Sequence, residues 1–129
     1  MSFFEECKKY VLNSINSKIS CEKKAVDMAV LYSRYFIENP NVFQLIFLED
    51  LGKQNFKINE PEILKLSHKN LIDCAEKNII DKDEIDNISA LIANTIHGNL
   101  LFYLKGRMEI ENDLILEKIK NEIEYIIYR

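Results

Sequence analysis

Apolar residues recur at intervals of three and four positions along most of this chain, which is the spacing of one face of an α-helix. The alternation of Val or Thr with polar residues that marks half-buried strands is not found. We therefore predict an all-α fold, a six-helix bundle that forms one domain over residues 1–129. The predicted helices cover roughly residues 2–15, 21–38, 40–51, 61–76, 88–104 and 112–128.

The segment Ala90–Leu104, ALIANTIHGNLLFYL, is the most uniformly apolar of these helices, because none of its faces carries a charged stripe. Asp86 and Lys105 bound it, and it is shorter than the roughly 20 residues that a helix needs to cross a bilayer. Such a helix is expected inside a core. The pattern therefore predicts the central helix of the bundle, covered partly by its own chain and partly by a second copy.

Composition and charge exclude some classes of binding partner for this chain. The net charge is -4 and the isoelectric point is about 5.3, so the chain lacks the positive charge that neutralises a phosphate backbone. We expect it to bind no nucleic acid by itself and to enter no membrane. Cys7, Cys21 and Cys74 form no closely spaced ligand pair, are odd in number and follow no secretory leader, which favours a cytoplasmic location.

Sequence motifs that carry catalysis are not found. The chain has three glycines and no nucleophile elbow, phosphate-binding glycine loop or dinucleotide fingerprint. A di-iron bundle needs Glu-x-x-His pairs, but Lys65 and Asn94 stand three residues before the two histidines. We therefore expect no enzyme activity, no cofactor and no metal site. The acidic run Asp81–Asp86 is interpreted as a cap of a helix N-terminus, with metal binding as the alternative.

The two histidines, His68 and His97, both fall on apolar faces of their helices. A buried imidazole needs a hydrogen-bond partner, so each histidine is either a satisfied core residue or part of a cavity. A mostly apolar cavity with a few polar groups is the usual form of a small-molecule site. The aromatic residues that fit such a cavity, and equally fit a plain core, are Tyr32, Tyr35, Phe43 and Phe47.

Gly98 stands in the middle of the apolar helix, where glycine costs about 1 kcal/mol relative to alanine. It is either an unfavourable accident or a point where another backbone approaches closely. We favour the close approach, because Leu91, Thr95 and Phe102 share its face and have no obvious partner within the chain.

Three segments in this order resemble the C-terminal, ligand-binding domain of the tetracycline-repressor (TetR) family of transcriptional regulators. AVLYSRYFIENPNVFQLIF is similar to a family helix that breaks at Asn-Pro and resumes with aromatic residues, and ALIANTIHGNLLFYLKGR is similar to its dimerisation helix. EPEILKLSHKNLIDCAEKNII lies between them, and an apolar helix closes the chain. The resemblance covers nearly the whole chain.

The resemblance implies a homodimer in which the last two helices of each copy pair, and a small hydrophobic or aromatic ligand enclosed by the preceding helices. Taken together with the helical faces, it maps the ligand site and the dimer interface onto two sets of residues. The ligand site is expected at Tyr32, Phe36, Phe43, Phe47, His68, Ile72 and His97. The dimer interface is expected at Leu91, Thr95, Gly98, Phe102, Ile115, Ile119 and Ile123.

The helix-turn-helix domain that such regulators carry before this region is absent from the 129 residues. The sequence therefore predicts the effector-binding and homodimerisation domain of a TetR-like repressor, either excised from a longer protein or naturally without its DNA-binding domain. The alternative function is a helical protein–protein interaction module without a ligand pocket.

Overall fold

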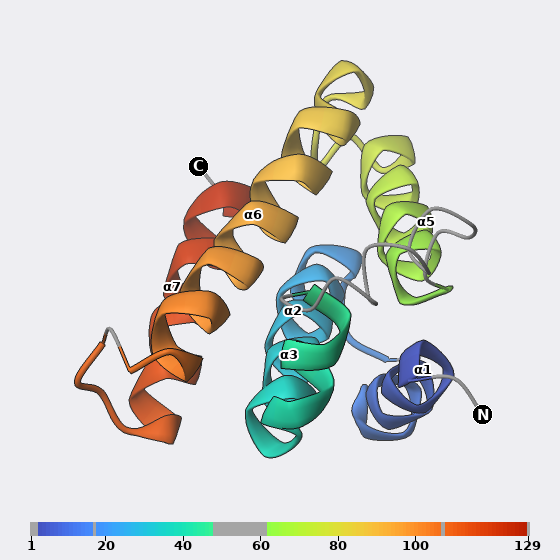
Figure 1. The fold of residues 1–129 in the computed structure, drawn as a ribbon. Coiled ribbons are helices and arrows are strands. Elements are labelled where there is room, and N and C mark those ends of the chain that lie inside the picture. Colours follow the sequence, from blue (N-terminus) through green and yellow to red (C-terminus); the bar gives the residue numbers. More distant parts are fainter. Residues whose placement is uncertain (1–2, 17, 48–61, 107, 129) are drawn as a thin grey trace.

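The computed structural model describes residues 3–16, 18–47, 62–106 and 108–128, and all of the regular structure in these ranges is helical (Figure 1). The prediction of an all-α bundle is confirmed, and the described residues form six α-helices. Residues 48–51, expected to end the third helix, lie outside the described residues. The elements are α1 (Phe3–Ser14), α2 (Cys21–Glu38), α3 (Pro40–Phe47), α5 (Glu62–Glu76), the short 3-10 helix η1 (Lys82–Glu84), α6 (Ile85–Leu104) and α7 (Asn112–Tyr128).

Helix α2 is the centre of the bundle. It packs against α1, α3, α5, α6 and α7, and α6 and α7 run side by side in opposite directions along it (Figure 1). Its apolar positions cover more than one face, so it can be surrounded on several sides. Its buried residues are Cys21, Ala25, Val26, Met28, Ala29, Tyr32, Ser33, Tyr35 and Phe36.

The polar groups of α2 are satisfied locally. The buried Ser33 hydroxyl donates to the Ala29 carbonyl at 2.8 Å, as serine inside a helix commonly does. At the end of the helix, Asn39 Nδ2 donates to the Tyr35 carbonyl at 2.8 Å, and Pro40 opens α3 at the position where a missing N–H costs nothing. The side chain of Asn39 therefore satisfies one of the last carbonyl groups of α2 where the chain turns into α3.

Helix α6 buries one face and leaves the opposite face exposed. Ile88, Ile92, Ile96, Asn99 and Leu100 are buried, whereas Leu91 is 43% exposed and Phe102 is 53% exposed. The expectation that this helix is the central one is therefore wrong, because α2 occupies that place. Its own chain covers only part of α6, as predicted from its uniform apolarity, and cover of the remaining face by a second copy stays a prediction.

A small polar network joins α6 to α7. The buried Asn99 donates from Nδ2 to the Thr95 carbonyl and to Glu122 Oε1, and its Oδ1 accepts from Lys118 Nζ, each at 2.8 Å. Burial raises the pKa of Glu122, but hydrogen bonds from Lys118 and Asn99 outweigh it, so the net pKa is lowered. The network fixes the register of the two helices because each polar group has its partner only in this alignment.

Helix α7 presents its isoleucine stripe to the inside of the chain. Ile115, Ile119 and Ile123 are 0% exposed, and α7 packs against α2 and α6. These three residues, expected at the dimer interface, are enclosed by their own chain and offer no side-chain surface to a second copy in this arrangement. The large apolar residues that α7 does expose are Leu114, Tyr125 and Tyr128, at 55%, 74% and 53%.

Two further contacts position α5 and α6. Asn70 on α5 is buried and donates from Nδ2 to the Cys21 carbonyl at 2.8 Å, which ties α5 to the start of α2. Asp81 Oδ1 accepts from the Asp83 N–H at 2.9 Å and caps η1, which leads into α6. Of the acidic run, Asp81 therefore caps η1, whereas Glu84 at the N-cap position of α6 makes no side-chain capping hydrogen bond.

Candidate ligand-binding site

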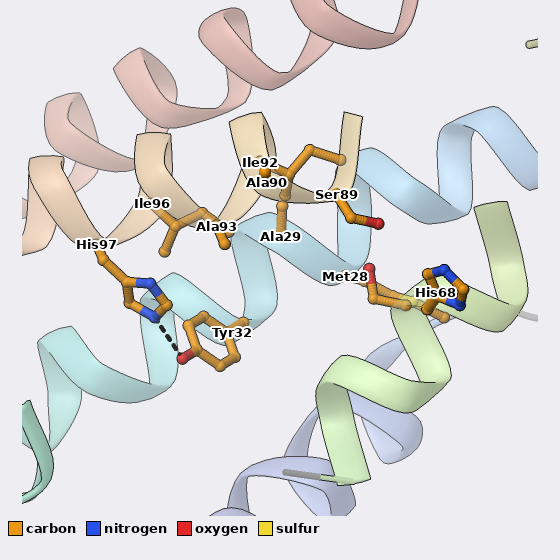
Figure 2. A pocket seen from close by; sticks show the side chains of 11 residues that line it. Met28, Ala29, Tyr32, His68, Ser89, Ala90, Ile92, Ala93, Ile96 and His97 are labelled. Carbon is orange, nitrogen blue, oxygen red and sulfur yellow. Dashed lines mark hydrogen bonds between the residues drawn. The ribbon is translucent and has the colours of Figure 1, made fainter. Parts of the chain in front are cut away.

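A cavity of about 250 Å³ lies between α2, α5 and α6 (Figure 2). Its wall is formed mainly by Met28, Ala29, Ile92, Ala93 and Ile96, so it is apolar over most of its length. Polar side chains stand at its two ends, with Tyr32 and His97 at one and His68 and Ser89 at the other (Figure 2). The complete lining is Met28, Ala29, Tyr32, Ser67, His68, Ser89, Ala90, Ile92, Ala93, Ile96 and His97.

Tyr32 and His97 form a hydrogen-bonded pair across the inner end of the cavity. The Tyr32 hydroxyl oxygen lies 2.7 Å from His97 Nε2, and the rings meet edge to face with centroids 5.6 Å apart. Tyr32 lies on α2 and His97 on α6, and the two residues are 65 positions apart in the sequence. The pair therefore forms only when these two helices are packed together.

The ionisation of this pair is set by its surroundings. Burial lowers the pKa of His97, and a hydrogen bond with the Ala93 backbone opposes that effect only in part. Burial also raises the pKa of the Tyr32 hydroxyl well above its usual range. Both groups are therefore neutral at neutral pH, and the inner end of the cavity carries no charge.

His68 marks the outer end of the cavity. Its side chain is 44% exposed, and Nε2 lies 3.6 Å from Oδ1 of Asp86, which is 97% exposed. Charge pairs this open to water contribute little to stability. His68 and Asp86 also line a neighbouring depression, together with Lys65, Lys69, Ile72 and Ser89.

The structure brings together three of the seven residues expected at the ligand site. Tyr32, His68 and His97 line the cavity. Ile72 is 38% exposed and lies in a neighbouring depression that shares His68 with the cavity. Phe47 closes α3, and its side chain lies outside the described residues.

Phe36 and Phe43, also expected at the ligand site, are not among the residues that line the cavity. Their side chains are 0% and 2% exposed, and they pack edge to face with each other at 5.6 Å between ring centroids. Phe36 also packs against Tyr32 at 5.0 Å. Both phenylalanines therefore lie in the core, and Phe36 supports the Tyr32 ring that borders the cavity.

Most of the cavity wall was not predicted. Met28, Ala29, Ala93 and Ile96 are ordinary apolar residues whose pattern indicates only a helix face that is covered. The one usable signal in the sequence is the small size of Ala29, Ala90 and Ala93. Alanines on facing helices leave room that larger side chains would fill. The cavity therefore exists because these side chains are small. The spacing of apolar residues predicts which face of a helix is covered, but not whether the covering side chains fill the space.

Acidification is expected to destabilise the fold through His97. Because burial holds the folded-state pKa below the ordinary value near 6.5, the unfolded chain binds more protons between the two values. Stability should therefore fall as the pH drops below about 6.5, by at most about 1.4 kcal/mol per pH unit. Urea unfolding between about pH 7.5 and pH 5.5 measures this, and His97→Gln should flatten the profile. An equally steep profile in both proteins would contradict the assignment to His97.

Four residues expected at the dimer interface lie on the outer face of α6. Leu91 and Phe102 are exposed, and Thr95 and Gly98 are partly buried. A Cβ atom added at Gly98 would meet nothing within 4 Å. Among the described residues of this chain, no backbone approaches Gly98 closely, so a close approach by the backbone of a second copy stays a prediction.

Two further findings come from the described residues. No group of three or more His, Cys, Asp or Glu residues among them is arranged to hold a metal ion. No helix in the described ranges is both long and apolar enough to span a membrane. Comparisons of the chain with protein-family models, with curated proteins and with solved structures found no match.

Proposed function

We propose that this chain is a domain that binds a small apolar molecule and forms a homodimer, in the manner of the effector domain of a TetR-like transcriptional regulator. The cavity between α2, α5 and α6 carries the ligand-binding part of the proposal. Its apolar wall and few polar groups have the form usual for small-molecule sites. The assignment to a regulator rests on the sequence resemblance.

The outer face of α6 supports the homodimer. Leu91 and Phe102 are large apolar side chains that stay exposed on a helix whose other face is in the core. Exposed apolar residues gathered on one face mark an interaction surface. A second copy is the occupant we propose, because Gly98 between them lets another helix backbone approach closely.

Thermal unfolding in the presence of small apolar compounds tests the ligand-binding part. A compound at about 100 times its dissociation constant should raise the free energy of unfolding by about 2.7 kcal/mol, which is several degrees in Tm. Ala93→Phe should abolish the shift, because the added ring occupies the cavity that Ala93 lines. Asn13→Phe is the matched control, since it adds the same ring at an exposed position of α1.

The alternative function, an interaction module that needs no pocket, makes a different prediction. A compound that shifts wild type and the Asn13→Phe variant but not Ala93→Phe would support the proposal. Equal shifts in all three proteins would place binding outside the cavity and contradict it. Absence of any shift across a broad set of apolar and aromatic compounds would favour the interaction module.

A further inference from the structure

Among the residues that the structure describes, Tyr32 and His97 are the polar side chains at the inner end of the cavity. The Tyr32 hydroxyl oxygen lies 2.7 Å from His97 Nε2, and a phenol O–H is a stronger acid than the N–H of a neutral imidazole, whose other nitrogen is the stronger base of the two partners. We therefore assign the N–H of the ring to Nδ1, in agreement with the backbone hydrogen bond at Ala93 that raises the pKa of His97 against the effect of burial. Nε2 of the neutral ring is then an acceptor, and the Tyr32 O–H donates to it.

This arrangement uses the only proton of the Tyr32 hydroxyl and leaves its oxygen lone pairs available. Figure 2 shows Tyr32 and His97 together at one end of the lining, with Ala93 and Ile96 beside them. A ligand group that reaches this end can therefore donate a hydrogen bond to Tyr32 but finds no proton to accept there. A carboxylate would in addition lose its hydration in an apolar site without a balancing charge.

We propose that the cavity selects a neutral apolar molecule that donates one hydrogen bond, from a hydroxyl or an N–H, to the Tyr32 oxygen. This inference rests on the proposed ligand-binding function and specifies the chemical class of the ligand. The chain of hydrogen bonds runs from the ligand to Tyr32, from Tyr32 to His97 and from His97 to the Ala93 carbonyl. His97 is a positioning residue. It sets the direction of the Tyr32 proton but does not contact the hydroxyl or N–H group of the ligand.

The size of the cavity suggests a suitable probe. An apolar cavity of about 150 Å³ holds one benzene ring, so the cavity of about 250 Å³ has room for two fused rings. Three probes share this body: naphthalene has no polar group, 2-naphthol can donate, and 2-methoxynaphthalene can only accept. Calorimetric titration of the whole chain with each probe gives three dissociation constants for every protein variant.

Wild type should bind 2-naphthol about 3- to 10-fold more tightly than either naphthalene or 2-methoxynaphthalene, which is the range of one neutral hydrogen bond. In His97→Phe, the Tyr32 proton is released and can point at the ligand. 2-Methoxynaphthalene should then gain at least about 3-fold over naphthalene. In the double variant Tyr32→Phe, His97→Phe, the preferences for both polar probes over naphthalene should disappear.

Naphthalene is the internal reference in each protein, so a variant that changes the volume of the cavity still reports the polar preference. Circular dichroism and thermal unfolding establish that each variant is folded. If a variant fails to fold, the affinities of wild type for the three probes still test the inference. Binding of 2-methoxynaphthalene that is as tight as that of 2-naphthol, or tighter, overturns it.

The outcomes separate this inference from the proposed function. Saturable binding of all three probes with equal affinity overturns the donor selectivity and leaves ligand binding intact. A preference for 2-naphthol that survives in the double variant places the acceptor elsewhere, for example at Ser67 or Ser89, and also overturns the inference. Binding of none of the probes overturns the inference and counts against the proposed function as well.

Discussion

Replacing Phe36 by alanine is expected to lower the free energy of unfolding by about 3–5 kcal/mol, the usual cost of truncating a buried aromatic side chain. Phe36 is 0% exposed, and its ring packs edge to face with Tyr32 and Tyr35 at 5.0 and 5.2 Å between centroids, and with Phe43 at 5.6 Å. The loss combines apolar burial, these ring contacts and the cavity left behind. Urea unfolding monitored by circular dichroism measures the change.

The matched control is Tyr125→Ala, which removes another aromatic side chain from a position that is 74% exposed. Its effect should stay within about 0.5 kcal/mol, as is usual for surface substitutions. Phe36→Leu, which keeps much of the apolar volume, serves if the alanine variant does not fold. A cost of Phe36→Ala below about 1 kcal/mol would contradict the placement of Phe36 in the core, because truncation there cannot be that mild.

Placing arginine at Gly98 is expected to raise the dissociation constant of the homodimer at least 100-fold, about 2.7 kcal/mol. In the proposed dimer the two copies meet on the outer face of α6, where Leu91 and Phe102 are exposed. An interface between identical faces brings the two new charges close to each other in a desolvated place, which costs several kcal/mol. Sedimentation over a range of concentrations measures the constant.

Gly98→Ala and Asn13→Arg complete this experiment. An added Cβ at Gly98 meets nothing within 4 Å in the single chain, so Gly98→Ala should stabilise the monomer by up to about 1 kcal/mol through helix propensity. Asn13→Arg adds the same charge at an exposed position of α1 and should leave dimerisation unchanged. A wild type that remains monomeric at high concentration, or a dimer insensitive to Gly98→Arg, would contradict the proposed dimer.

The helices themselves could be predicted because their signals are local. The apolar spacing of the last segment predicted residues 112–128, and α7 is Asn112–Tyr128. Asn39 and Pro40 predicted the break between the second and third helices, where the restricted backbone of proline decides the outcome within a few residues.

Which helix lies at the centre could not be predicted, because burial depends on how much surface the other helices can cover. The sequence from Ala90 to Leu104 is more uniformly apolar than α2, yet α2 contacts five other α-helices and α6 keeps one exposed face. The same reason explains the isoleucines of α7. Periodicity places Ile115, Ile119 and Ile123 in one stripe, but it does not say whether that stripe meets the same chain or a second copy.

The candidate site could likewise be predicted only in part. The sequence alone determined that His68, His97 and Tyr32 fall on apolar helix faces, since a helical period assigns each residue to a face whatever the neighbours are. Only the tertiary structure decided that Tyr32 and His97 meet at 2.7 Å while Phe36 and Phe43 fill the core beside them. That choice depends on the packing of helices distant in sequence, and on the space that small residues such as Ala29 and Ala93 leave between them.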